Sequence, residues 1–343
     1  MESSLQLIRR AARVVLHRRM SYVFGTLVEV VIAGAKTPVA CEATDAVLGE
    51  LDRLHWKLHA WKSGDLVDLN RAIAAGRRPL VVDREIGSVI RSATCLSVRS
   101  HGLFNPAIGR LVGLWHFHDD VCRGEVPDAV EIAGLVQANP QMSDLVVGEG
   151  DLVCTNPSVQ LDFGGYAKGY ALDRARELLR ERNITDAFIN MGGHVMALGR
   201  CGDRRWAVAI RHPRNAGVLA RLELDDGEIV SSSGDYERYF FANGRRYAHI
   251  IHPRTGYPVD HAQAVSVLTS PGHDSGALSE AASSALFVAG PHAWRAAANR
   301  LGVTCALLVD RNGKVHLTSA MEDRLDGPQV RVFDVSASRK AMK

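Results

Sequence analysis

The chain has 343 residues, of which 46% are hydrophobic and 23% charged, and its net charge is +3. This length and composition are typical of a globular protein with one large or two ordinary domains, and the small charge gives no argument for nucleic-acid binding. The six cysteines are scattered without a C-x-x-C pair, so we expect reduced, buried residues and not a disulfide scaffold.

The first 21 residues form a basic stretch that we expect to lie outside the folded domain. Arg13 and His17 interrupt the apolar run that a twin-arginine or other secretory signal needs, and no cysteine is available there for lipidation. No apolar span of 18 residues occurs, which excludes a transmembrane helix. We therefore predict a cytoplasmic protein with a solvated N-terminal extension. A basic helix that contacts a membrane or a partner is the alternative.

The first half of the chain alternates strand-like and helical segments. The β-rich residues 22–32 predict a first strand, and residues 43–58 carry apolar side chains at helical spacing. A loop follows over residues 61–70. Asp83 is placed to cap a second long helix. After it we expect a turn over 102–109, an apolar stretch over 111–117 and a short helix behind Pro127.

Residues 161–174 combine a glycine-rich turn with the start of a helix. They read Leu-Asp-Phe-Gly-Gly-Tyr-Ala-Lys-Gly-Tyr-Ala-Leu-Asp-Arg, and strand-like segments precede them at 152–154 and 159–161. The first N–H groups of a helix are unpaired and attract anions, and Lys168 adds a full positive charge. We therefore expect an anionic, phosphate-bearing ligand here, although the glycines could instead only permit tight packing. The stretch matches neither the P-loop nor the G-x-G-x-x-G pattern.

The second half is richer in strands. Residues 192–194, Gly-Gly-His, offer another place where backbone can approach a ligand, and 249–258 reads as a strand that ends in a Pro/Gly turn. Strands and helices mix without strict βαβ alternation, which favours an α+β fold. We further predict a tail over 331–343, a helix over 277–288, a hairpin over 303–318, and strands over 186–191, 206–210, 222–224, 229–232 and 265–269.

Three motifs, in this order and spacing, resemble the ApbE family of FAD:protein FMN transferases. They are the glycine turn above, Ser-Gly-Asp-Tyr-Glu-Arg-Tyr at 233–239, and His-Ile-Ile-His-Pro-Arg-Thr-Gly-Tyr-Pro at 249–258. The resemblance implies an ApbE-like domain over 22–330, with antiparallel or mixed sheets and flanking helices. It also implies an enzyme that binds FAD and Mg²⁺, transfers FMN to a Thr or Ser hydroxyl of an acceptor protein and releases AMP.

The resemblance also implies roles for single residues. Lys168 would neutralise a pyrophosphate oxygen, and His249 would be the general base for the acceptor hydroxyl. Mg²⁺ would be held by the backbone carbonyl of Gly165 together with Glu280 and Ser284, which lie four residues apart on one helix face. Asp235 would be either an anchor or a turn residue. Besides Lys168, the positions expected to line FAD are Phe24, Trp61, Leu103, Phe104, Asn105, Asp162 and Ile251, with Trp61 stacking on a ring.

The chain departs from the family's usual residues around the expected site. Glu280 and Ser284 replace Asp and Thr, and the other departures are Phe24 for Met, His194 for Asn, Asp or Glu, and His252 for Asp. Two further functions stay open: an FAD pyrophosphatase that releases FMN and AMP, and a non-catalytic flavin-binding or carrier protein. Lys168 and His249 favour an enzyme, whereas the Glu280 and Ser284 pair favours the carrier.

Overall fold

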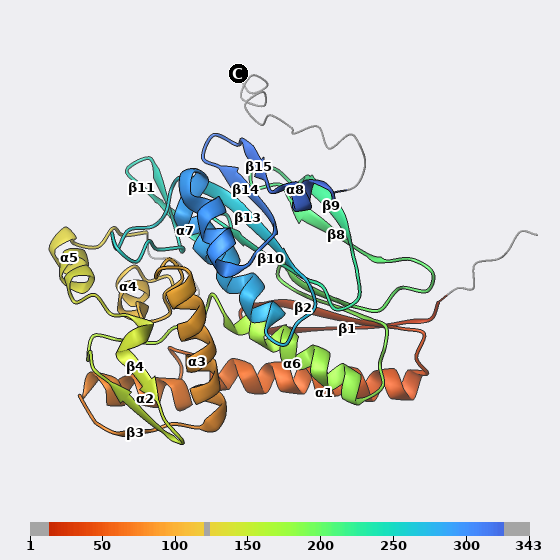
Figure 1. The fold of residues 1–343 in the computed structure, drawn as a ribbon, viewed down its shortest axis with the longest axis horizontal. Helices are drawn as coiled ribbons and strands as arrows, with labels where there is room; N and C mark the ends of the chain where they lie inside the picture. Colours follow the sequence, from red (N-terminus) through yellow and green to blue (C-terminus); the bar gives the residue numbers. More distant parts are fainter. Residues whose placement is uncertain (1–13, 120–123, 326–343) are drawn as a thin grey trace, which may run out of the picture.

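The structure, a computed structural model, describes residues 14–119 and 124–325. Its centre is an eight-stranded sheet in which all neighbouring strands run antiparallel (Figure 1). Helices flank this sheet, so the predicted α+β class is confirmed. In sheet order the strands are β1 Leu16–Val23, β2 Thr26–Ala33, β6 Ala187–Met191, β7 His194–Leu198, β10 Ile229–Gly234, β13 Ala262–Thr269, β14 Cys305–Asp310 and β15 Val315–Leu317.

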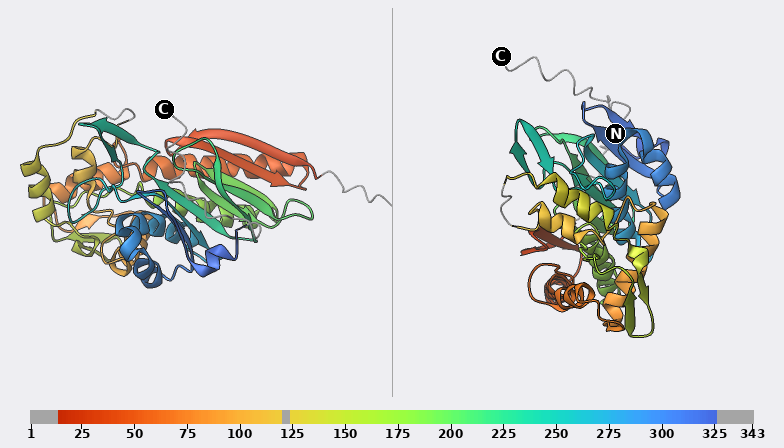
Figure 2. Two further views of the ribbon diagram at one scale, coloured as in Figure 1. Left: turned by 90° about the horizontal axis from the view of Figure 1, so that it is seen from above. Right: turned by 90° about the vertical axis from the view of Figure 1, so that its left-hand side faces the viewer.

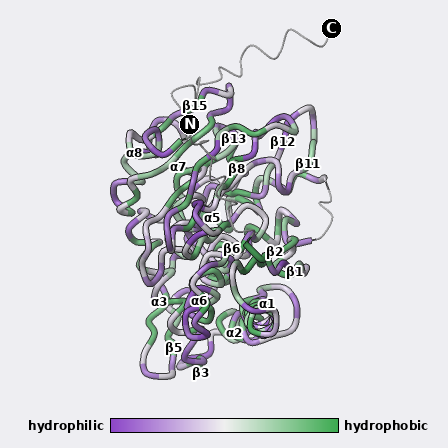
Figure 3. The backbone as a smooth tube through the Cα atoms, turned by 90° about the vertical axis from the view of Figure 1, so that its right-hand side faces the viewer, coloured by the Kyte–Doolittle hydropathy of each residue, from purple (hydrophilic) through white to green (hydrophobic). Residues whose placement is uncertain are grey.

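Three helices cover one face of the large sheet and a hairpin covers the other. α1 and α6 bury aliphatic side chains against β2, β6 and β7, while α7 packs on β10, β13 and β14. Figure 3 shows that β2, against which α1 packs, is mostly hydrophobic. The opposite face is covered by β8 and β9 through Trp206 and Leu222. The bounds are α1 Thr37–Lys57, α6 Ala167–Glu181, α7 Ser275–Leu301, β8 Trp206–Arg211 and β9 Val218–Leu224.

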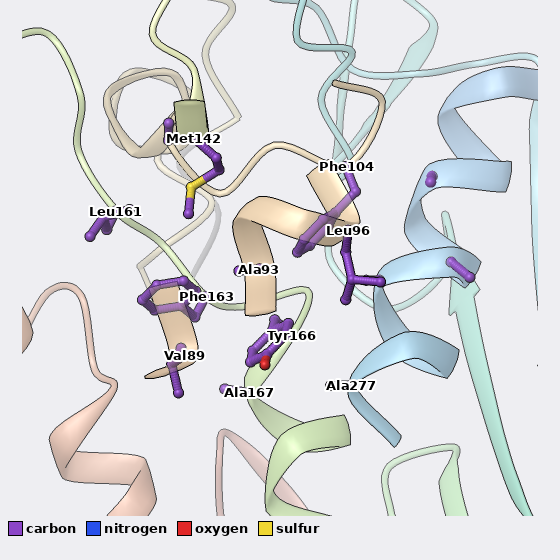
Figure 4. Packing of buried hydrophobic residues seen from close by; sticks show 14 of the residues in the cluster. Val89, Ala93, Leu96, Phe104, Met142, Leu161, Phe163, Tyr166, Ala167 and Ala277 are labelled. Atoms are coloured by element: carbon purple, nitrogen blue, oxygen red, sulfur yellow. The ribbon is translucent and has the colours of Figure 1, made fainter. Parts of the chain in front are cut away.

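A smaller group of elements packs beside α7 and the start of α6. Asp83 caps α3 as predicted, since its side chain accepts the N–H groups of Glu85 and Ile86. Phe163 and Tyr166, from the glycine turn, pack against this helix (Figure 4). The elements are α2 Asp65–Ala74, α3 Arg84–Arg99, α4 Gly109–Leu114, α5 Ala129–Gln137, the 3₁₀ turn Met142–Asp144, and a three-stranded sheet of β3 Leu80–Val81, β5 Asp151–Cys154 and β4 Leu145–Val147.

The chain opens with a hairpin where we expected one strand over 22–32. Phe24 and Gly25 form its two-residue turn, with φ of 54° and 67°. Two left-handed residues are what a type I′ turn needs to match the twist of its strands. Figure 2 shows the hairpin lying alongside α1. The turn was missed because strand-favouring residues stand on both sides of Gly25, so the segment reads as one strand.

The predicted boundary at residue 21 is wrong, because residues 16–21 belong to β1. Arg18 and Arg19 lie on this edge strand and pair with Glu29 and Asp45. Charged side chains are common on edge strands, where they face water and discourage pairing with other chains. A basic composition therefore did not mark an extension. The rest of the expected extension and the tail over 331–343 lie outside the described residues.

Several predicted loops and strands differ from the structure for local reasons. α2 begins at Asp65, inside the predicted loop. Residues 159–161 form only an isolated bridge, from Gln160 to Ile108. The Asn70 side chain pairs with both the N–H and the carbonyl of Leu161, at 2.8 and 2.9 Å, in place of a strand partner. Residues 249–258 hold only an isolated bridge. β7 was missed, and so was the hairpin of β11 Tyr239–Ala242 and β12 Arg245–Ala248.

α6 and α7 begin in direct backbone contact. A Cβ atom on Gly169 would lie 2.1 Å from the carbonyl oxygen of Gly276, and one on Gly276 would lie 2.2 Å from that of Gly169. No side chain fits between the helices at this point. α7 also extends beyond the predicted 277–288, through a break at Gly290, whose φ is 67°. The two glycines therefore set how the first turns of α6 and α7 face each other.

Across residues 14–119 and 124–325, no helix is both long enough and apolar enough to cross a membrane.

Candidate active site

Lys168 and Glu280 meet where the first turns of α6 and α7 lie together. Lys168 Nζ is 3.0 Å from Glu280 Oε1 and 3.4 Å from the carbonyl oxygen of Gly164. The N–H of Gly169 donates to Glu280 Oε2 at 2.7 Å. This amide belongs to the first turn of α6 and has no partner within the helix. A carboxylate of the protein itself thus occupies part of the predicted anion site.

Glu280 is ionised in this setting. Its side chain is 2% exposed, and burial alone would raise the pKa of its carboxyl group. The charge of Lys168 and the N–H of Gly169 outweigh burial, so the pKa lies below its usual value. His194 Nε2 is 3.6 Å from Glu280 Oε1, and burial lowers the pKa of His194 to about 4. His194 is therefore a neutral neighbour at physiological pH.

Two of the residues expected to hold a metal, Gly165 and Ser284, lie next to each other. A Cβ atom on Gly165 would lie 3.2 Å from Ser284 Oγ, and Ser284 follows Glu280 by one helical turn. Ser284 Oγ is also 3.5 Å from the hydroxyl of Ser233, which bonds to Ser283 Oγ at 2.7 Å. The sequence motif included Ser233, but only the structure gives it a place beside Ser284.

Trp61 and Asp162 form a second part of the site at the other end of the glycine turn. The indole N–H of Trp61 donates to Asp162 Oδ2 at 2.9 Å, while Asp162 Oδ1 accepts the N–H of Gly164 at 2.7 Å. The Trp61 ring stacks on His118, with ring centroids 4.0 Å apart. One face of the ring predicted to stack on a ligand is therefore covered by a side chain of this chain.

His249 lies near two positively charged side chains. Its Nδ1 is buried and has no hydrogen-bond partner within the described residues. Burial, then the positive charges of Arg238 and Lys168, lower the pKa of His249 to about 4. Its backbone N–H donates to the carbonyl of Arg238 at 3.0 Å. The imidazole is therefore neutral, which is the form that can accept a proton.

The remaining predicted residues lie in different environments. Phe104 is buried, and its ring edge lies 3.9 Å from where a Cβ atom of Gly165 would stand. Asn105 is engaged within the chain, donating to the Pro140 carbonyl at 2.9 Å and accepting the Ala107 N–H at 3.1 Å. Leu103 is half-buried, Ile251 packs in a cluster with Trp115, and Phe24 lies in the first hairpin turn.

Asp235 and His252 both have local structural roles. The guanidinium of Arg214 donates to both carboxylate oxygens of Asp235, at 2.7 and 2.6 Å. His252 Nδ1 accepts the N–H of Arg254 at 3.1 Å, as an aspartate does in an Asx turn. The departure at His252 therefore preserves the local turn.

Asp173 is a supporting residue to which we assigned no role from sequence. Its Oδ1 and Oδ2 accept the N–H groups of Gly276 and Ala277, each at 2.9 Å, and Arg176 pairs with it at 2.8 Å. Asp173 belongs to α6 but caps α7, which locks the two helices together. It could have been found in the motif at 164–174, which ends on this acid and an arginine.

Comparisons with known proteins cover the part of the chain that holds these residues. The model of the ApbE family matches residues 24–308, which include every residue that we place in the site. A protein of Rhodobacter capsulatus described as FAD:protein FMN transferase is 41% identical over 305 residues. These cover 89% of this chain but 57% of that relative, so the chain spans little more than half of its length.

Two solved structures share the fold. The ApbE protein of Thermotoga maritima MSB8 is 27% identical with a TM-score of 0.82, and the match covers 90% of this chain and 99% of that one. The apo form of the Pseudomonas stutzeri flavinyl transferase ApbE is 29% identical with a TM-score of 0.78, covering 92% and 98%.

Proposed function

The chain belongs to the ApbE family, and on that basis we propose that it is an FAD:protein FMN transferase. It would move FMN from FAD to a Thr or Ser hydroxyl of an acceptor protein and release AMP, with Mg²⁺ as cofactor. The observation that carries this proposal is the contact of Lys168, at the start of α6, with Glu280 of α7, together with the approach of Gly165 to Ser284 on the same helix. The names of the relatives supply the substrate class.

The charge of the site fits a diphosphate. Lys168 and Arg238 are positive groups that both act on His249, and the side chain of Lys168 is 21% exposed. A bound diphosphate would be attracted to these cations and would neutralise them. Because their charges hold the pKa of His249 down, substrate binding would raise that pKa towards the range in which a general base works well.

The oxygen donors at this point also fit Mg²⁺, which prefers carboxylate, carbonyl and hydroxyl oxygens. Glu280, Ser284 and the carbonyl of Gly165 would hold the ion. Both carboxylate oxygens of Glu280 already contact donors, but each oxygen has a second lone pair that is able to bind a cation. When bound, Mg²⁺ would reduce the negative charge on the phosphate oxygens and so favour attack on phosphorus.

His249 would take the proton of the acceptor hydroxyl as its oxygen attacks the phosphorus of the FMN half. The new oxygen–phosphorus bond forms while the bond to the AMP phosphate breaks, and AMP leaves with the bonding electrons. Lys168 would stabilise the charge that develops on the phosphate oxygens. Phe104 and Trp61 would contribute ring surfaces to the flavin or adenine.

One observation favours the carrier alternative. Lys168 and the Gly169 N–H already satisfy Glu280, so the protein neutralises this carboxylate without a metal. A site that binds FAD through its rings and phosphates, but does not cleave it, would fit this arrangement.

AMP release separates these possibilities. The purified protein is incubated with FAD and a Thr-containing acceptor peptide, with and without Mg²⁺, and AMP and peptide-bound flavin are measured. We expect both products only with Mg²⁺, and neither from His249→Ala, which should still bind FAD. AMP with free FMN alone would indicate a pyrophosphatase, and bound FAD without AMP would indicate a carrier. Either result would contradict the transferase.

A further inference from the structure

A second group of metal-binding side chains lies next to the candidate site. His116, His118 and Asp119 follow α4, and one ligand atom from each lies within 4.8 Å of the others. His118 is the residue that stacks on Trp61. The group is separate from Gly165, Glu280 and Ser284.

The distances within this group suit a small divalent ion. His116 Nδ1 is 3.4 Å from Asp119 Oδ2, and His118 Nε2 is 3.2 Å from Asp119 Oδ1. Ligands about 2.1 Å from Zn²⁺ in a tetrahedral arrangement are about 3.4 Å apart. The two imidazoles contact different oxygens of Asp119, and one ligand atom of each residue lies within 4.8 Å of the others, so side-chain rotation can bring all three onto one ion.

The backbone presents the two imidazoles together. Trp115 and Phe117 are buried, so they anchor the segment on either side of His116. His116 has a φ of 57°, a left-handed conformation that is uncommon for a residue other than glycine. Arg238 also holds the segment, because its guanidinium donates to the Phe117 carbonyl at 3.1 Å.

The polar atoms of the group give a second reason to expect a ligand. His116 Nδ1 is shielded from solvent, and apart from the 3.4 Å contact with Asp119 Oδ2 it has no hydrogen-bond partner among the described residues. Buried polar atoms are normally satisfied by protein, water or an ion. A cation at this point would satisfy that nitrogen and would also bring the histidines and the carboxylate into one coordination shell.

We propose that His116, His118 and Asp119 bind a divalent transition-metal ion, with Zn²⁺ as the best match. Two imidazoles and one carboxylate are a donor set that binds Zn²⁺ and related ions, whereas Mg²⁺ prefers oxygen ligands alone. The bound ion would fix His118 against Trp61 and so hold one wall of the proposed flavin pocket. The metal site itself does not depend on the transferase activity.

The test uses Co²⁺, which replaces Zn²⁺ and absorbs visible light when histidine ligands bind it tetrahedrally. The full chain without an affinity tag is treated with chelator and titrated with Co²⁺ in excess Mg²⁺, with Zn²⁺ as competitor. We expect one equivalent of Co²⁺ to bind with visible bands and to be displaced by Zn²⁺. No bands, or their loss to Mg²⁺, would overturn the proposal.

Two variants locate the ion without removing the packing. His118→Phe keeps a ring on Trp61, and His116→Asn suits the left-handed backbone, so each should fold, as checked by thermal unfolding. Each should weaken Co²⁺ binding at least about tenfold. His273→Ala is the matched control, because His273 is exposed beside the carboxylate of Asp274.

Glu280→Gln is a second control, since it alters only the oxygen site. His273→Ala and Glu280→Gln should both keep the Co²⁺ bands. Bands that persist in His116→Asn and His118→Phe, or that are lost in Glu280→Gln, would place the ion elsewhere and overturn the proposal. The absorption is measured without FAD, so a failed transferase assay would not affect the result.

Discussion

At the scale of single residues, His249 offers the clearest test of the site's electrostatics. Burial, Arg238 and Lys168 lower its pKa to about 4. An NMR titration of its imidazole should therefore find it neutral at pH 6 in the free protein. Of the two neighbouring positive charges, that of Arg238 lowers the pKa of His249 more, so Arg238→Met should raise this pKa. Arg71→Met, on an exposed part of α2, should leave the pKa unchanged. An ordinary pKa near 6.5 in the unaltered protein would contradict this environment.

The same shift predicts how stability depends on pH. The unfolded chain gains the His249 proton near pH 6.5, but the folded protein gains it only near pH 4. The unfolded state thus binds more protons between these values, so the free energy of unfolding should fall as the pH falls through this window. His249→Gln should reduce the slope in urea unfolding measured from pH 7 to 4. An unchanged slope would show that the group does not contribute.

The Lys168 and Glu280 pair also belongs to this scale. Lys168→Met leaves a buried carboxylate with only the Gly169 N–H and the neutral His194 beside it. Breaking a buried pair typically costs about 3 kcal/mol, so urea unfolding should show a loss of that order. Adding Glu280→Gln should recover much of it, because the uncompensated charge is gone. If the double variant is no more stable than Lys168→Met, the two side chains are not coupled in this way.

At the scale of elements, the contact of α6 with α7 should tolerate no side chain. Gly169→Ala would place Cβ 2.1 Å from a backbone oxygen, and the helices would have to move apart. We expect the free energy of unfolding in denaturant to fall by at least about 2 kcal/mol. The proposed FMN transfer should fall by more than this loss of stability explains. The reason for the larger loss is that Lys168 and Glu280 sit on the two helices.

Gly49 provides the matched control for that substitution. It lies in the interior of α1, and a Cβ atom there would meet nothing within 4 Å. Gly49→Ala should therefore stabilise the protein by up to about 1 kcal/mol, through helix propensity alone. Equal effects at Gly49 and Gly169 would mean that the close approach of the helices is not what matters.

At the scale of the whole molecule, FAD should stabilise both parts of the fold at once. The site draws Phe104 from the smaller group of elements, and Glu280 and Ser284 from α7 beside the large sheet. FAD at about 100 times its dissociation constant should raise the free energy of unfolding by about 2.7 kcal/mol. Urea unfolding followed by circular dichroism and by tryptophan fluorescence should shift together. Two transitions, of which FAD moves only one, would contradict a shared site.

The sequence predicted the helices better than the strand boundaries. Asp83 and the spacing of apolar residues identified α3 because a cap and a period are local properties. The first hairpin and the Asn70 pairing with Leu161 could not be found this way. In the first case strand-favouring residues stand on both sides of Gly25 and read as one strand. In the second case the Asn70 side chain, from far along the chain, takes the place of a strand partner.

The site was predicted as a set of residues but not as a set of contacts. Motif matching placed Lys168, Gly165, Glu280 and Ser284 together, and the structure brings these residues close to one another. Motif matching did not show that Glu280 would accept a hydrogen bond from the start of α6, or that His118 would stack on Trp61. Such contacts depend on how α6 and α7 cross and on how the chain returns after α4, which no single stretch of sequence encodes.

The first hairpin turn carries a consequence for the order of biosynthesis. A guanidinium nitrogen of Arg238 lies 2.9 Å from where a Cβ atom of Gly25 would be, beside the residues that surround His249. The wall of the site therefore joins the earliest elements of the chain to segments made far later, and Ser284 is made later still. A ribosome must release nearly the whole domain before the candidate site can form, and contacts of such long range form slowly. In the proposed function, FAD can therefore bind and stabilise the fold only at the last stage of folding, long after β1 and β2 have been synthesised.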